Sequence, residues 1–172
     1  MNNVYAMYLA IGFSTMIGAM DNSPTVETPL TYAVLNGELE RVEQLLAENQ
    51  FLANTPNSEG VPPLFMTTVT KCKEGQLIML GKDADGVNKC VCSEITQRLL
   101  FAGANINYQL QTYGTPLMAA IEQCHFPVIK KLIEFAADVN IKRKEDGMTA
   151  LALAKKWGCQ RTIAELEKVG AK

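Results

Sequence analysis

The sequence predicts an all-helical repeat solenoid, a stack of helix–turn–helix units that carries one insertion. The first observation is a block beginning Thr28-Pro29-Leu30. It returns at Pro62-Pro63-Leu64, Thr115-Pro116-Leu117 and Thr149-Ala150-Leu151, at spacings of 34, 53 and 34 residues. The second is a closing phrase, since Phe101-Ala-Gly-Ala-Asn-Ile-Asn107 is similar to Phe135-Ala-Ala-Asp-Val-Asn140. A repeat period in this range is typical of stacked-repeat proteins.

Each block is expected to begin a first helix. Threonine is a good N-cap, because its side-chain oxygen accepts from the unpaired N–H groups of the first turn. Proline at the next position has a helical φ and no N–H to leave unpaired. Ala33, Ala120 and Ala154 each follow their block start by five residues, where a small residue lets two helices approach. Gly37 and Gly158 follow by nine residues and are expected to end their helices in the left-handed conformation.

A second helix is expected to follow each first one. Residues 38–46, 95–101 and 128–135 place apolar side chains at helical spacing. The two asparagines that end the closing phrases, Asn107 and Asn140, lie 33 residues apart. Each unit would therefore consist of two helices and a connecting loop, and it would bury its apolar face only against its neighbours.

Taken together, these motifs resemble the ankyrin repeat, over about residues 28–170. The resemblance implies four repeats, near 25–57, 58–107, 108–141 and 142–172. Several positions depart from the family pattern: Thr31, Phe65, Met118 and Ala152 replace the usual histidine, Thr67 occupies the small site, and Cys124 replaces a glycine at a helix end. The resemblance implies a non-catalytic module that binds other proteins.

The first 20 residues contain no charged side chain, and residues 4–13 form an apolar run. An apolar run followed by small residues is typical of a secretory signal, so residues 1–20 are predicted to be a signal peptide and the location periplasmic or secreted. Two alternatives stay open. The run could be an uncleaved membrane anchor, although it is short for a span, or an apolar helix that covers the first repeat of a cytoplasmic protein.

About 20 residues beyond the repeat length lie within the second repeat, at 71–92. Residues 76–80 and 87–91 are predicted to form two strands of a β-hairpin, because 81–86 between them is rich in turn residues. Long insertions are often functional, so the hairpin is expected to add a contact surface. The alternative is that its apolar residues pack back onto the second repeat.

Three of the five cysteines flank the insertion, namely Cys72, Cys90 and Cys92. In an oxidising compartment, a bridge from Cys72 to Cys90 or Cys92 would contribute roughly 3 kcal/mol by closing a short loop. The alternatives are three reduced thiols or a zinc site, which the short Cys-x-Cys spacing and the single histidine disfavour. Cys124 and Cys159 fall at helix boundaries and are expected to be partly buried, unpaired thiols.

No catalytic set is apparent in the sequence, so the protein is predicted not to be an enzyme and to need no cofactor or metal. His125 is the only histidine, and no glycine-rich phosphate loop follows a strand. Residues 1–86 carry 4 basic and 10 acidic side chains, whereas residues 87–172 carry 12 and 8. This polarity bears on how a partner approaches. Nucleic acid is not expected, because the isoelectric point is near 5.5.

The resemblance implies that partners bind at the loop tips and on the concave face of the first helices. By offset, the tips are residues 54–62, 108–114 and 141–148. Exposed tyrosine suits protein contact, and the lysines would suit an acidic partner surface. The predicted partner-binding residues are Tyr108, Gln109, Gln111, Tyr113, Glu122, Lys142, Arg143, Lys144 and Lys156.

These features lead to one functional expectation and one rival. The first is an exported binding protein that inhibits a partner, as immunity proteins inhibit toxic enzymes or effectors. The rival is a cytosolic adaptor or scaffold, or an effector directed into a host. Neither expectation includes a small-molecule substrate, and membrane contact is expected only if residues 1–20 stay uncleaved.

Overall fold

The computed structural model describes residues 28–69 and 90–172 of the chain, and within these ranges it contains helices but no β-strand. The elements are α2 (Pro29–Asn36), α3 (Leu39–Glu48), η2 (Gln50–Asn54), α4 (Pro63–Val69), α5 (Val91–Phe101), α6 (Pro116–Glu122), α7 (Phe126–Glu134), α8 (Ala150–Trp157) and α9 (Gln160–Lys168). η2 is a short 3-10 helix that the sequence does not predict.

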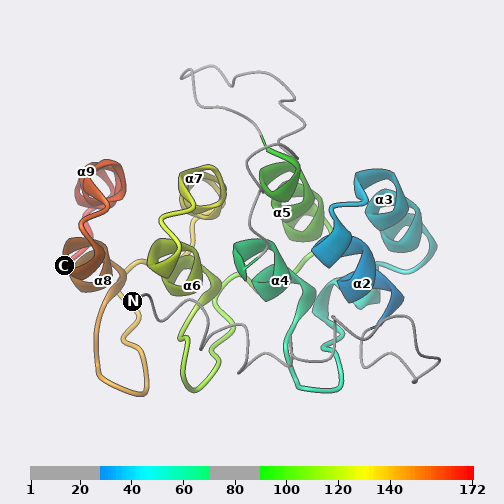
Figure 1. The fold of residues 1–172 in the computed structure, drawn as a ribbon, viewed down its shortest axis with the longest axis horizontal. Coiled ribbons are helices and arrows are strands. Elements are labelled where there is room, and N and C mark those ends of the chain that lie inside the picture. Colours follow the sequence, from blue (N-terminus) through cyan, green and yellow to red (C-terminus); the bar gives the residue numbers. More distant parts are fainter. Residues whose placement is uncertain (1–27, 70–89) are drawn as a thin grey trace.

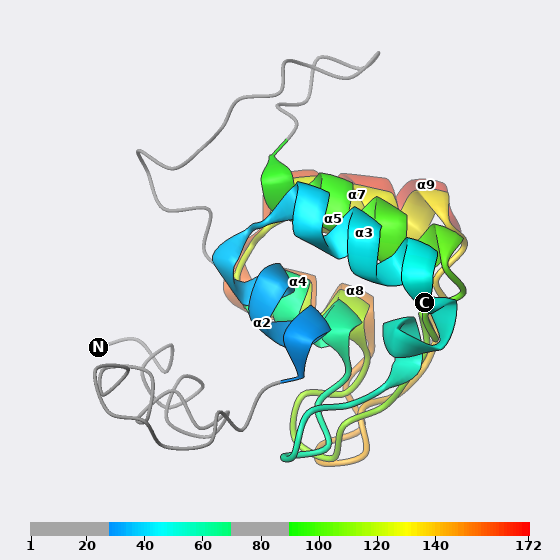
Figure 2. The ribbon, with the colours of Figure 1, turned by 90° about the vertical axis from the view of Figure 1, so that its right-hand side faces the viewer.

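The helices form two layers (Figures 1 and 2). The first helices α2, α4, α6 and α8 stack in one layer, and the second helices α3, α5, α7 and α9 stack in the other. The segments that connect successive pairs project together on one side of the molecule, which both views show. This is the predicted all-helical stack.

The predicted N-caps of three first helices are confirmed. The side chains of Thr28, Thr115 and Thr149 accept hydrogen bonds from backbone N–H groups three residues on, at 3.2, 3.4 and 3.3 Å. Gly37 and Gly158 end α2 and α8 in the left-handed conformation, as expected. Cys124 adopts the same conformation after α6, with φ of 48°, so the position demands it even of a residue other than glycine.

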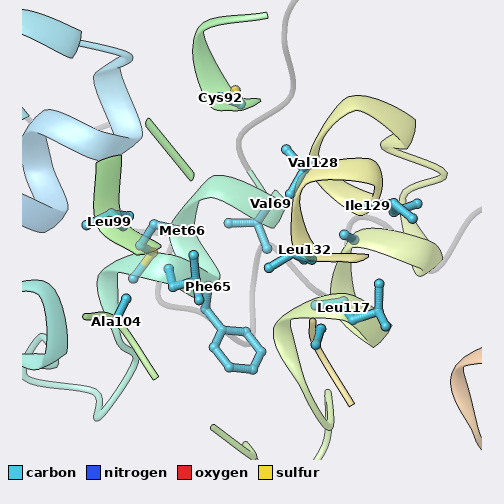
Figure 3. Packing of buried hydrophobic residues seen from close by; sticks show 14 of the residues in the cluster. Phe65, Met66, Val69, Cys92, Leu99, Ala104, Leu117, Val128, Ile129 and Leu132 are labelled. Carbon is cyan, nitrogen blue, oxygen red and sulfur yellow. The ribbon is translucent and has the colours of Figure 1, made fainter. Parts of the chain in front are cut away.

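The core lies between the two layers and continues through the stack (Figure 3). In α6, every residue from Pro116 to Ile121 is buried. The alanines predicted at the small site, Ala33, Ala120 and Ala154, are also buried. Thr67 fits the same site because its hydroxyl donates to Leu64 O at 2.8 Å and accepts from Thr96 on α5 at 3.0 Å.

A ladder of asparagine side chains joins the connecting segments of neighbouring units. Asn54 Oδ1 accepts from Asn105 N at 2.7 Å, and Asn107 Oδ1 accepts from Asp138 N at 3.0 Å. Asn140 Oδ1 accepts from Lys172 N at 3.0 Å. Each rung pairs a backbone group of one unit with a side chain of the preceding unit. The 33-residue spacing of Asn107 and Asn140 therefore marks a contact between units.

The second predicted strand is wrong at its end, because Val91 begins helix α5 and Cys90 is its N-cap. Ser93 favours the helix start, since its N–H donates to Cys90 Sγ while its hydroxyl accepts from Cys90 N. The rest of the predicted hairpin and the predicted signal peptide lie outside the described residues. Among the helices that are described, none has the length and apolarity to cross a membrane.

Cys124 and Cys159 form a disulfide, so the expectation that they are unpaired is wrong. Their Cα atoms lie 5.9 Å apart, although 35 residues separate them in the chain. The bond forms because Cys124 follows α6 and Cys159 is the N-cap of α9 in the next unit. A bridge from Cys72 to Cys90 or Cys92 stays a prediction, because Cys72 lies outside the described residues.

Replacing both cysteines of this bond in Cys124→Ser/Cys159→Ser is expected to lower the free energy of unfolding by up to roughly 4 kcal/mol, because the loop that the bond closes in the unfolded chain is long. Urea unfolding of the variant and the wild type, both without reductant, measures the loss. Equal unfolding midpoints would show that the bond contributes nothing to stability.

Replacing Ala136 by glycine is expected to stabilise the protein by about 1 kcal/mol, because Ala136 is exposed and has a φ of 60°. Gly103 follows α5 at the equivalent place, with φ of 84° and open space where a Cβ would lie. The reciprocal variant Gly103→Ala is therefore expected to lower the free energy of unfolding by about the same amount. Thermal unfolding of both variants checks the pair, and a destabilised Ala136→Gly protein would contradict the account.

Candidate protein-binding surface

The three predicted loop tips lie side by side along one edge of the stack (Figures 1 and 2). The middle loop closes through an isolated bridge in which Leu110 and Gly114 exchange backbone hydrogen bonds of 2.9 and 3.0 Å. This bridge leaves Gln111 and Thr112 exposed at the turn. The tip is therefore a tight turn with a fixed shape.

The two tyrosines of the middle loop are anchored on the core. Tyr108 is 37% exposed, and its ring meets Phe65 of α4 edge to face at 6.4 Å. Tyr113 is half-buried against the core, and burial, followed by the charges of Glu122 and Glu145, raises the pKa of its hydroxyl. Rings held in this way lose little conformational entropy on contact with a partner. Gln109 between them is half-buried.

Arg143 in the last loop is buried, in contrast to its neighbours Lys142 and Lys144. Its guanidinium bonds Glu122 at the end of α6 and Asp146 in its own loop. The Nε–Oδ1 distance to Asp146 is 2.9 Å. Arg143 and Asp146 also close the loop through the backbone of Met148. Arg143 and Glu122 thus hold the loop to the stack from within. Whether these two side chains also contact a partner stays a prediction.

The Arg143 contacts also alter the acidity of the loop. A hydrogen bond from Arg143 is the main cause that lowers the pKa of Asp146 to about 2, and the charge of Lys156 adds to it. The same carboxylates raise the pKa of Arg143, so the guanidinium stays charged. Lys156 therefore lies near this loop, although it belongs to α8.

Three exposed lysines give this end of the surface its positive charge, namely Lys142, Lys144 and Lys156. Lys156 Nζ lies 6.0 Å from the ring centre of Trp157, which is 42% exposed. The sequence predicts the lysines but not Trp157. The sequence does contain a signal for Trp157: it is the last residue of a first helix, directly before the helix-ending Gly158. A residue at that place lies at the edge of the stack and is exposed.

A second cluster lies away from the loops, where Cys90, Cys92 and His125 bring one ligand atom each to within 4.8 Å of one another. Cys90 and His125 are the N-caps of α5 and α7, which pack together. The sequence separation of 35 residues hides this proximity until the units are stacked.

Replacing Asp146 by asparagine is expected to flatten the acid dependence of stability. Because the folded pKa is lowered to about 2, the carboxylate stabilises the fold above its ordinary pKa of 3.8 and loses this effect as the pH falls through 2. Urea midpoints measured from pH 5 to pH 2 should fall more steeply for wild type than for Asp146→Asn. Glu145→Gln removes an exposed carboxylate of the same loop and is expected to keep the steep fall.

The comparisons with known proteins agree with the stacked geometry. A family model described as ankyrin repeats (3 copies) matches residues 87–172. Among curated proteins, the chain is similar to the ankyrin repeat and KH domain-containing protein mask-1 of Caenorhabditis elegans. The two are 27% identical over 142 residues, which cover 78% of this chain and 5% of that protein.

The matched region includes the middle and last loops and the helices α5 to α9. Ankyrin repeats are protein–protein interaction modules and are generally not catalytic. The described helices, the caps and the match over half of the chain lead to one conclusion: this protein belongs to the ankyrin-repeat family and is a module for binding other proteins.

Proposed function

We propose that this protein binds an acidic face of another protein through the middle and last loops and the end of α8. The observation that carries the proposal is a set of three exposed lysines. Lys142 and Lys144 lie on a loop that the buried Arg143 fixes from within, and Lys156 lies at the end of α8 beside it. A surface held in its bound shape loses less entropy on association than a flexible one.

The two kinds of side chain in the surface would do different work. The anchored rings of Tyr108 and Tyr113 offer apolar area at low entropy cost. The lysines at the rim would speed the encounter with an acidic partner and favour one orientation. Residues 87–172 carry more basic side chains than residues 1–86, and this excess would also attract an acidic partner to this end of the stack.

We further propose that the protein is exported and that its binding inhibits the partner, as an immunity protein inhibits a toxic enzyme or effector. The disulfide between Cys124 and Cys159 supports an oxidising compartment, and the uncharged residues 1–20 support export. The second candidate is a cytosolic adaptor or scaffold, or a host-directed effector, in which all five thiols would stay reduced.

Intact mass of the protein expressed from its own start codon, with and without thiol alkylation, tests the export. We expect the loss of about 19 residues and protection of the two cysteines, Cys124 and Cys159, from alkylation. A full-length mass with all five cysteines alkylated would contradict export and favour the cytosolic candidate.

Reversing two loop charges in Lys142→Glu/Lys144→Glu is expected to abolish capture of the partner from extracts of the source cells. The matched control is Arg41→Glu/Lys168→Glu, which makes the same change of net charge at exposed sites on the outer helices α3 and α9. Quantitative mass spectrometry should find proteins enriched by wild type and control but not by the loop variant. Equal enrichment by all three would contradict the proposed surface.

Inhibition is tested on the protein identified by that capture. A stoichiometric inhibitor should bind with a Kd on the order of nanomolar or tighter and should abolish the partner's activity at a ratio of one to one. A captured enzyme that stays fully active when saturated would rule out the inhibitor role and leave the adaptor role.

A further inference from the structure

We propose that Cys90, Cys92 and His125 form a zinc site that ties α5 to α7 on the second-helix layer. The three residues come from two neighbouring units and share no loop with the binding surface described above. Cys92 lies in the first turn of α5, as Figure 3 shows. The site is thus independent of the proposed partner binding.

One pair of ligand atoms has the separation that a zinc ion requires, and the third atom lies close enough to reach the same ion by a small shift of its side chain. Cys90 Sγ lies 3.6 Å from His125 Nε2, and the three ligand atoms are all within 4.8 Å of one another. Zinc binds sulfur at about 2.3 Å and imidazole nitrogen at about 2.0–2.1 Å. Tetrahedral angles between such bonds place sulfur and nitrogen about 3.6 Å apart and two sulfurs about 3.8 Å apart.

The short Cys-x-Cys spacing is compatible with this geometry because the backbone turns between the two cysteines. Cys90 is extended, with φ of −116° and ψ of 157°, whereas Val91 is the first residue of helix α5. The chain therefore bends at the N-cap, and the sulfur of Cys92 in the first turn comes back toward that of Cys90. Zinc was disfavoured from the sequence because Cys-x-Cys is too short for a zinc knuckle, and a strand was predicted here. The helix start at Val91 removes that objection.

The charge and surroundings of the cluster also suit the ion. Two thiolates and a neutral imidazole balance the charge of Zn²⁺, which a mostly buried site needs. Both cysteines lie at the start of an eleven-residue helix, whose partial positive charge favours thiolates. Cys90 Sγ already accepts a backbone hydrogen bond from Ser93 N at 3.4 Å. Three protein ligands leave the fourth tetrahedral position to water.

A cysteine beside a histidine is also the arrangement of a nucleophile and its base. Burial argues against that use here, because Cys90 is 1% exposed and Cys92 is 5% exposed. A substrate carbonyl would have to reach a sulfur that lies beneath the surface. A metal ion needs only an entry path of atomic size, so the burial of both sulfurs favours a bound metal ion over a reacting thiol.

The test uses the full-length protein, made metal-free by chelation and titrated with Co²⁺, whose absorption reports thiolate ligands, and with Zn²⁺ against a chromogenic chelator. We expect one ion per chain and a charge-transfer band of two thiolates. Cys92→Ser and His125→Gln should each weaken Zn²⁺ binding by about 100-fold or more. The control Cys124→Ser/Cys159→Ser, which leaves the cluster intact, should bind as wild type does.

A second readout separates loss of the ion from loss of the fold. Zinc at about 100 times its Kd should raise the thermal midpoint of wild type and control by about 5 °C or more, and that of His125→Gln hardly at all. If a variant does not fold, the Co²⁺ spectrum of wild type decides, and a band without thiolate character would overturn the site. Unaltered zinc affinity in both variants would also overturn the site. A disulfide from Cys72 to Cys90 or Cys92 in peptide maps of the untreated protein would do the same.

Discussion

The structure depends on one constraint: the first helix of each unit is buried only because the neighbouring units cover it. Helix α6 shows this most clearly, since it packs against α4 on one side and α8 on the other, and its residues from Pro116 to Ile121 are all buried. No single unit could bury such a helix alone. The small alanines and the bonded pair Thr67 and Thr96 matter because they set how closely the layers approach.

The same stacking positions the loops that are proposed to bind. A connecting segment on its own would have many conformations, and ordering it would cost entropy on binding. Here the side chains of Asn54, Asn107 and Asn140 each hold the backbone of the following unit, and Arg143 holds its loop to Glu122 of the preceding one. The contact surface is thus a product of contacts between units rather than of any one loop sequence.

Local features were accessible from the sequence and contacts between units were not. The threonine caps, the glycine ends and the helix pairs follow from residues a few positions apart, so their chemistry is visible in the chain. The strand predicted through Val91 failed because a short apolar run does not distinguish a strand from the start of a helix, and the cap formed by Cys90 and Ser93 decided it.

The pairs Cys124 with Cys159 and Cys90 with His125 were missed for a different reason. Each pair is separated by 35 residues, which is close to the repeat period, and residues one period apart become neighbours when units stack. Reading the sequence one period apart, rather than along local motifs, would have placed both pairs together. The burial of Arg143 was also hidden, although the Asp three residues later, Asp146, is the partner that allows it.

Within residues 28–69 and 90–172, two residues other than glycine are left-handed, Cys124 and Ala136, and both belong to the helix pair α6 and α7. Backbone strain of this kind costs about 1–2 kcal/mol at each residue, so it is concentrated in the unit between the tyrosine loop and the lysine loop. While the disulfide is intact, Cys124 offsets its strain with a bond to the last unit. In reducing surroundings the strain would remain without the bond, although the Arg143–Glu122 ion pair and the hydrogen bond from Lys172 to Asn140 would still hold the last unit to α6–α7. The last two units are therefore the part of the array whose stability depends on the redox state of its surroundings.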